Sequence, residues 1–336
     1  MLAQSAAQPN AQSRSLLLNK IQGENIWAIV VGIDNYKSPM FSPALQGYRN
    51  DAESNNIVLL QDQQATRSAI MHSIERLFVT NGSITAGSVV FFYFAGHGSR
   101  DLLSDSATVV ETLCPYDQGY RVYSIAQPTL HKVFDGLEKA KKCNVVVILD
   151  SCHAGGMSPR HRRIQERNVG RTTNRAAHVR SAEHVKSQVL PDSFDRDIVK
   201  RVAKMIRPNS RVDANNRHET VGSVEHQYVV LAACGKEQRA HEIQYKGPDG
   251  TLKWRGAFTA ELMGILCKLG EKRRSYYQII ADIKDRLSLV AEGQEPECRG
   301  ASSYQRVFMH YHVDLSRKYQ AGQAAAAGQH WNYGGR

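Results

Sequence analysis

The sequence predicts an α/β protein with a mostly parallel central sheet and helices on both of its faces. Three short, near-continuous apolar runs, rich in β-branched and aromatic residues, indicate buried strands at residues 26–34, 89–95 and 145–149. Segments in which apolar residues recur at helical intervals separate these runs. An alternation of strands and helices is typical of parallel sheets that are covered on both sides.

The remaining elements are expected in a regular order along the chain. After the first strand, capping residues introduce a helix over 50–61, and helical spacing predicts another over 66–78. Further helices are expected over 128–141, 258–269 and 275–290, further strands over 227–233 and 306–313, and a hairpin over 243–254.

The composition excludes several classes of protein. The 336 residues are 42% hydrophobic and 22% charged, which indicates a globular chain with one large α/β domain or two smaller ones. No run of about 18 apolar residues predicts a membrane span, and no secretory signal is recognisable. Six widely spaced cysteines without a CxxC pair favour reduced thiols in the cytoplasm, with the nucleus as the alternative. A zinc site is not expected, because His310 and His312 fit one face of a strand.

Most of the positive charge is concentrated in one segment. Of a net charge of +11, the window 157–220 carries 15 basic and 7 acidic residues. This window has a single aromatic residue, Phe194, and therefore little on which nucleic-acid bases could stack. A solvated basic linker is favoured over a nucleic-acid surface.

His97 and Cys152 each follow the end of a predicted parallel strand. The carboxyl ends of parallel strands meet at one edge of a sheet, where ligands bind, so topology places both residues at that edge. A cysteine attacks as its thiolate, and a nearby histidine can accept the thiol proton. A lone cysteine after a buried strand is usually a small apolar residue, but the joint occurrence of both residues favours nucleophilic chemistry.

The sequence resembles the caspase-like cysteine peptidases, and among them the metacaspases and related fungal caspase-domain proteins. The matching segments span about residues 26–270 in the expected order: WAIVVGIDNY, GYRNDAESN, VVFFYFAGHG, VVVILDSCHAGG, VVLAACGKEQRAHE and RGAFTAELM. The resemblance implies a three-layer caspase-like fold and a cysteine-type endopeptidase. It also implies a dyad with Cys152 as nucleophile and His97 as general base and acid. The backbone N–H groups of Gly98 and Cys152 would form the oxyanion hole, whereas His153 is expected to shape the loop.

The resemblance further implies cleavage after basic residues. Asp150 lies two residues before Cys152, and Asp51 matches the Asn-Asp motif whose carboxylate joins the same specificity pocket in metacaspases. Carboxylates in such a pocket suit Arg or Lys. Asp51 could also cap a helix, and the two roles can coexist. Ala95 replaces a serine that the family often has in this pocket, which weakens the inference of tight selectivity.

No cofactor or metal is expected. Many metacaspases are activated by calcium, but the matching stretch, residues 123–128, has no carboxylates. Hard cations need several anionic oxygens, and the scattered Asp101, Asp105 and Asp117 are at most remnants of such a site.

The composition and the resemblance together divide the chain. We expect a loose leader over 1–25, a large-subunit-like region over 26–156, and a basic, disordered linker over 157–222. A small-subunit-like region over 223–313 would complete the same domain, and 314–336 would be a low-complexity tail. Self-cleavage is a hypothesis for the linker, which has arginines at 160, 162, 163, 167, 171, 175 and 180. An insertion without a regulatory purpose explains it equally well.

Two functions remain open at this point. The first is an endopeptidase whose partners are peptide substrates with Arg or Lys before the scissile bond, including the chain itself. The alternative is a catalytically weak caspase-fold scaffold or signalling protein. Binding to membranes or nucleic acid is not expected. A role in programmed cell death is suggested only by analogy, and monomer and dimer are both compatible with the sequence.

Overall fold

The computed structural model describes eleven parts of the chain, from Ile26 to Val307. They are residues 26–38, 56–104, 108–119, 121–157, 178–179, 188–191, 195–206, 227–246, 252–268, 274–305 and 307. A six-stranded sheet of order β13-β10-β7-β3-β1-β2 forms the centre, and β13 is its one antiparallel member. Its strands are β1 (Ile26–Gly32), β2 (Ile57–Gln61), β3 (Val89–Ala95), β7 (Asn144–Asp150), β10 (Val229–Ala232) and β13 (Glu297–Arg299).

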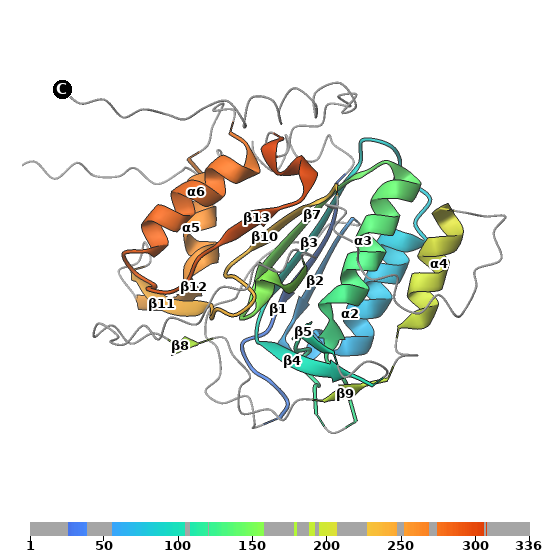
Figure 1. The fold of residues 1–336 in the computed structure, drawn as a ribbon, viewed down its shortest axis with the longest axis horizontal. Coiled ribbons are helices and arrows are strands. Elements are labelled where there is room, and N and C mark those ends of the chain that lie inside the picture. The colour runs from blue at the N-terminus through green and yellow to red at the C-terminus, as the bar shows by residue number, and fades with distance from the viewer. Residues whose placement is uncertain are drawn as a thin grey trace, which may run out of the picture.

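Helices cover both faces of this sheet, as the sequence predicts. They are α2 (Arg67–Ser73, extended to Val79 by wider turns), α3 (Gln127–Lys141), α4 (Arg196–Ile206), α5 (Ala257–Leu266) and α6 (Tyr276–Leu287). Figure 1 shows α2, α3 and α4 on one side of the sheet and α5 and α6 on the other. The result is a three-layer α/β fold of the kind that the sequence predicts.

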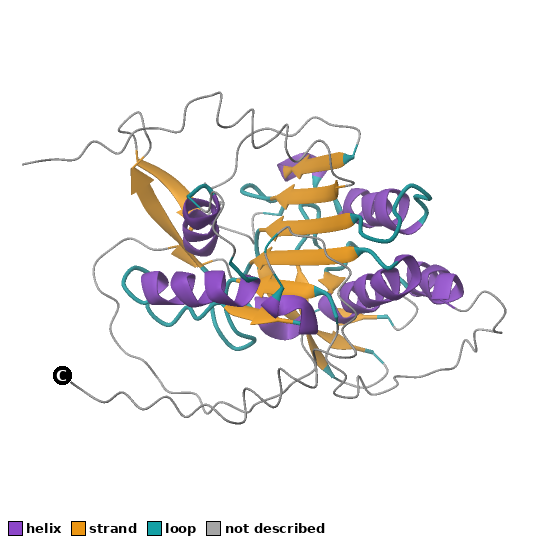
Figure 2. Cartoon of the chain, turned by 90° about the horizontal axis from the view of Figure 1, so that it is seen from above, coloured by secondary structure: helices purple, strands orange, loops and turns teal. Residues whose placement is uncertain are grey.

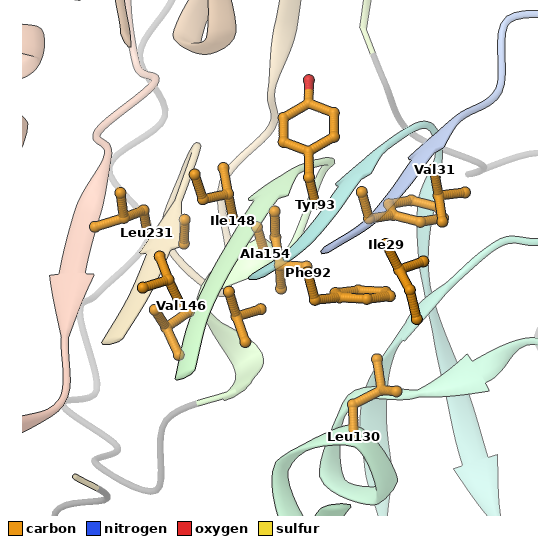
Figure 3. Close-up of a cluster of buried hydrophobic side chains, with 14 of the residues drawn as sticks. Ile29, Val31, Phe92, Tyr93, Leu130, Val146, Ile148, Ala154 and Leu231 are labelled. Atoms are coloured by element: carbon orange, nitrogen blue, oxygen red, sulfur yellow. The ribbon is translucent and has the colours of Figure 1, made fainter. Parts of the chain in front are cut away.

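Adjacent residues of β3 show how the two outer layers are attached. Successive strand residues point to opposite faces of a sheet. The Phe92 ring contacts that of Phe134 on α3, with centroids 5.4 Å apart, whereas the hydroxyl of Tyr93 lies 2.8 Å from Thr259 Oγ1 on α5. Figure 3 shows Phe92 and Tyr93 pointing in opposite directions, with Leu130 of α3 on the Phe92 side. Both faces of the sheet are therefore buried, which explains its near-continuous apolar strands.

Two small sheets flank the central one (Figure 2). The first, of order β6-β5-β4-β9, comprises β4 (Gly98–Leu103), β5 (Val109–Leu113), β6 (Ile125–Ala126) and β9 (Val189–Leu190). The second, of order β12-β11-β8, comprises β8 (His178–Val179), β11 (His241–Lys246) and β12 (Leu252–Gly256). Single turns of 3-10 helix occur at Asp62–Gln64, Ala154–Met157 and Ala301–Tyr304.

Two expected elements differ from the structure. The helix expected over 50–61 is wrong for residues 57–61, which form strand β2 parallel to β1; residues 50–55 lie outside the described residues. The run Ile57–Leu60 is apolar and partly β-branched, so pairing with β1 buries it better than a short helix would. The last strand, expected over 306–313, lies outside the described residues apart from Val307.

The expected linker contains ordered elements. Strands β8 and β9 and helix α4 all lie within 157–222. Helix α4 packs on α3 so closely that a β-carbon at Gly136 would stand 2.2 Å from Val202 Cγ1. The Arg67 guanidinium also contacts the Asp195 carboxylate at 2.6 Å. The structure therefore differs here from the expectation of a disordered linker, because the amphipathic α4 covers an apolar surface of α3.

Within the described residues, no helix is long and apolar enough to cross a membrane.

Candidate active site

The register of the central sheet brings His97 and Cys152 to the same edge. Ala95 of β3 pairs with Asp150 of β7 at the last position of both strands. His97 and Cys152 each follow two residues later, at the carboxyl ends of neighbouring parallel strands. The sequence-based placement of these two residues agrees with the structure.

Gly98 lies directly against the backbone of Cys152. A β-carbon at residue 98 would stand 2.0 Å from the Cys152 carbonyl oxygen and 3.4 Å from its nitrogen. No side chain fits there, which explains why glycine follows the histidine. The two backbones whose N–H groups are predicted to form the oxyanion hole are thus in contact.

His97 is buried, with 4% of its surface exposed, and both of its backbone polar groups are engaged. Its N–H donates a hydrogen bond to Tyr36 Oη at 2.7 Å, and its carbonyl accepts one from the Cys114 N–H at 3.1 Å. The Tyr36 and His97 rings are also in contact, with centroids 4.9 Å apart. Tyr36 is the last residue of the matched segment WAIVVGIDNY, but a tyrosine at this position does not by itself predict a contact with His97.

The Cys152 thiol is fully buried against the backbone of Ala240. Its Sγ accepts a hydrogen bond from the Ala240 N–H at 3.2 Å and donates one to the Ala240 carbonyl at 3.7 Å. Ala240 directly precedes β11 and lies in the matched segment VVLAACGKEQRAHE. The sequence marks this segment as part of the resemblance, but its contact with Cys152 depends on tertiary structure.

Two other buried cysteines, Cys114 and Cys234, lie near enough to Cys152 for its charge to affect their thiols. Cys234 donates hydrogen bonds to the carbonyls of Ser151 and Gln238, at 3.4 and 3.3 Å. Burial, with a smaller contribution from the charge of Cys152, raises the pKa of the Cys234 thiol well above its usual value. Burial, followed by the charges of Asp101 and Cys152, raises the pKa of Cys114 in the same way. Both thiols therefore stay protonated at neutral pH.

Asp150 is fully buried at the end of β7 and contacts the first turn of α5. Its Oδ2 accepts hydrogen bonds from the Thr259 hydroxyl at 2.5 Å and from the Thr259 N–H at 3.3 Å. A carboxylate in this position stabilises the positive end of the helix dipole. Asp150 therefore has a structural role in addition to the predicted substrate contact. Asp51 lies outside the described residues.

His153 has a φ of 58°, in the left-handed region, and its Nδ1 donates to the Lys236 carbonyl at 2.8 Å. Its backbone N–H donates to the Gln238 carbonyl at 3.2 Å. These bonds tie the loop after Cys152 to the loop after β10, which matches the expected loop-shaping role.

The aspartates that the sequence offers as remnants of a calcium site are engaged with protein groups. Asp101 is buried and accepts hydrogen bonds from the Thr112 hydroxyl at 2.9 Å, from the Gln188 N–H at 2.7 Å and from the Ser124 hydroxyl. Asp117 accepts one from the Arg67 N–H at 2.8 Å. Among the residues that the structure describes, no three His, Cys, Asp or Glu side chains are grouped as metal ligands would be. Asp105 is not among these residues.

Comparison with known proteins identifies the family. The model of the caspase domain family matches residues 25–308. No curated protein matches the chain. Similar solved structures include a protein from Geobacter sulfurreducens, with 17% identity, a TM-score of 0.46, and coverage of 85% of this chain and 98% of that one. Caspase-1 from Spodoptera frugiperda is 9% identical, with a TM-score of 0.42 and coverage of 86% and 92%. The structure of pro-sf-caspase-1 is 10% identical, with a TM-score of 0.41 and coverage of 82% and 91%.

The match to the family model covers most of the chain and includes both residues at the sheet edge. The chain therefore belongs to the caspase domain family and has the scaffold of a cysteine peptidase.

Proposed function

We propose that this chain is a cysteine endopeptidase of the metacaspase type, with Cys152 as nucleophile and His97 as general base and acid. The observation that carries this proposal is the pairing of Ala95 with Asp150 at the ends of adjacent parallel strands, because His97 and Cys152 each follow two residues later. His97 lies between two glycines, and Cys152 follows a serine, which leaves room for the backbone of a substrate.

The proposed reaction follows from these groups. Cys152 Sγ attacks the carbonyl carbon of the scissile peptide while His97 accepts the thiol proton. The N–H groups of Gly98 and Cys152 stabilise the oxyanion, a contribution of about 3 kcal/mol for each donor. The C–N bond then breaks, His97 protonates the leaving amine, and water hydrolyses the thioester. This releases the second product and restores the thiol.

The contact between Cys152 and Ala240 supports a latent resting state. A thiol that is fully buried against a backbone cannot reach a substrate carbonyl. Either the side chain of Cys152 must rotate or the segment around Ala240 must move before the reaction. We therefore propose that the full chain is a zymogen.

Selectivity for Arg or Lys before the scissile bond is proposed from Asp150. Its carboxylate lies at the end of β7, two residues from the nucleophile and next to Ala95, in an interior where a buried charge attracts a cation strongly. The contribution proposed for Asp51 comes from the sequence alone. No calcium requirement is proposed, because Asp101 and Asp117 are engaged with other groups. Location in the cytoplasm is retained as a proposal from the sequence.

Self-cleavage within the linker is proposed as the route to activation. Strand β8 pairs with β11, which begins next to Ala240, and β9 pairs with β4, which begins at Gly98. Cleavage of the linker between β8 and β9 would free the chain next to β11 and next to β4, and so on both sides of the site. If the full chain and its Cys152→Ala variant stay equally intact on long incubation, as followed by gel and mass spectrometry, self-cleavage is wrong.

The test of the main proposal is peptide cleavage. The full chain is first incubated until its linker is cut, by itself or by an added protease. Matched fluorogenic peptides ending in Arg, Lys or Asp are then offered to it, with calcium or with a chelator. We expect cleavage after Arg and Lys that is lost in Cys152→Ala and kept in Cys267→Ala, which removes an exposed thiol at the end of α5. Cleavage only after Asp would overturn the role of Asp150 in selectivity but leave the protease.

A catalytically weak scaffold is the second candidate, and the complete burial of Cys152 favours it. The two candidates differ in one result. If no peptide is cleaved even after the linker is cut by an added protease, the scaffold is the better explanation.

A further inference from the structure

Tyr36 holds both the backbone and the ring of His97. Its hydroxyl accepts the hydrogen bond from the His97 N–H at 2.7 Å and donates one to the Cys114 carbonyl at 3.3 Å. The ring planes of Tyr36 and His97 are tilted by 40°, with centroids 4.9 Å apart. A buried histidine that is bonded through its backbone and packed through its ring has little freedom to shift.

The loop that carries Tyr36 is itself anchored on both sides. Asp62 Oδ1 accepts hydrogen bonds from the N–H groups of Asp34 and Asn35, each at 2.8 Å. On the other side, the Lys37 N–H donates to the Tyr116 carbonyl at 3.0 Å. Tyr36 therefore projects from a fixed segment, so its contact with His97 can impose a position.

Gly96 shows how closely Tyr36 approaches the chain before His97. A β-carbon at residue 96 would stand 2.7 Å from Tyr36 Oη and 3.1 Å from the ring of Phe94. The glycine thus makes room for the tyrosine hydroxyl to reach the His97 N–H. Any larger residue at position 96 would push the hydroxyl away.

We propose that Tyr36 is a positioning residue that holds His97 where its imidazole can accept the proton of Cys152. The inference rests on the proposed function, in which His97 activates the thiol. Proton transfer requires the base within hydrogen-bond reach, and displacements of about 1 Å can lower rates about 100-fold. Tyr36 acts through His97, which distinguishes it from the catalytic pair.

The test uses the full chain with Tyr36→Phe, which keeps the ring and removes the hydroxyl, and the linker of every variant is first cut by the same added protease. Three quantities are measured: kcat and KM for the best peptide, and the rate at which iodoacetamide alkylates Cys152, with the modified residue located by mass spectrometry. We expect kcat and the alkylation rate to fall by about 10-fold, with KM within about twofold of wild type. Tyr277→Phe is the matched control and leaves both rates unchanged, because Tyr277 is exposed on α6 and stacks on Tyr304.

Two further variants make the outcome decisive. His97→Ala sets the lowest alkylation rate, and Gly96→Ala displaces the Tyr36 hydroxyl without removing it. Gly96→Ala is expected to lower the same rates, and it decides the question if Tyr36→Phe does not fold. Unchanged rates together with a lower Tm would mean that Tyr36 only stabilises the fold, and the proposal would be overturned.

Alkylation also separates this inference from the proposed function. If no peptide is cleaved but alkylation of Cys152 still depends on His97 and Tyr36, the peptidase is wrong and the positioning role stands. If alkylation does not depend on His97, Tyr36 has no thiol–imidazole pair to position and the inference fails.

Discussion

Gly98 and Cys152 approach each other so closely that a β-carbon at residue 98 would stand 2.0 Å from the carbonyl oxygen of the cysteine. The neighbouring atom belongs to the backbone and cannot rotate away, as a flexible side chain could. Residue 98 can therefore be enlarged only if the two strand ends separate. This separation would move His97 away from Cys152 and disturb the proposed oxyanion hole.

The first prediction follows from this contact. Gly98→Ala is expected to lower kcat/KM by at least about 100-fold, since one oxyanion donor alone contributes a factor of about 100 to 1,000. It should also lower Tm, because the overpacked backbone must shift. Gly82→Ala is the control, since no atom lies within 4 Å of a β-carbon there. Wild-type kinetics for Gly98→Ala would contradict the role given to this contact.

The second prediction concerns the hydroxyl of Thr259, which holds Asp150. Thr259→Val keeps the backbone N–H and removes the side-chain donor 2.5 Å from the carboxylate. We expect a loss of stability of about 1–3 kcal/mol, because a buried carboxylate loses a partner. If Asp150 binds the basic side chain, the ratio of kcat/KM for Arg over Lys peptides should also change.

Tyr93→Phe is the matched control for Thr259→Val. The Tyr93 hydroxyl contacts Thr259 Oγ1 at 2.8 Å, so its removal perturbs the same network but leaves the bond to Asp150. We expect a lower Tm without a change in selectivity. An equal change of selectivity in both variants would show that the effect does not act through Asp150.

The position of the site could be predicted from sequence because it depends on strand order and on strand ends. Apolar runs identify buried parallel strands, and parallel strands place their carboxyl ends at one edge. The strands that precede His97 and Cys152 therefore predict the position of both residues. They also predict both helical layers, since β3 is apolar at every position from Val89 to Ala95.

What the sequence could not show depends on contacts between distant segments. Residues 57–60 are apolar enough for a helix or a strand, and only pairing with β1 decides between them. The contacts of Tyr36 with His97 and of Ala240 with Cys152 join residues 61 and 88 positions apart. The many charged residues of the linker do not indicate α4, because its apolar face is buried only by packing on α3 at Gly136.

The third prediction tests the packing of α4 on α3. Gly136→Val is expected to weaken the attachment of α4, because Val202 Cγ1 would be 2.2 Å from the first added carbon. We expect a loss of about 1–3 kcal/mol in the free energy of unfolding and faster hydrogen exchange in α4. Gly264→Ala is the control, because nothing lies within 4 Å of a β-carbon on that side of α5. Unchanged exchange in Gly136→Val would contradict the packing.

The fourth prediction uses the pH dependence of stability. Burial, reinforced by the neighbouring charge of Asp135, raises the pKa of Glu138 on α3 from 4.5 to about 8. The folded protein therefore keeps this carboxyl protonated at neutral pH, whereas the unfolded chain ionises it above about 4.5. Raising the pH from 4.5 to 8 thus favours the unfolded state, and the stability contributed by the neutral carboxyl is lost across this window.

Glu138→Gln removes this dependence, because an amide does not titrate. The variant should have a free energy of unfolding close to wild type near pH 4.5 and exceed it by several kcal/mol at pH 8, since a pKa difference of one corresponds to about 1.4 kcal/mol. Urea unfolding of both proteins at the two pH values measures this difference directly. Glu292→Gln, at an exposed position, controls for the loss of one charge. A gap between Glu138→Gln and wild type that does not widen as the pH rises would show that Glu138 is ionised in the folded protein.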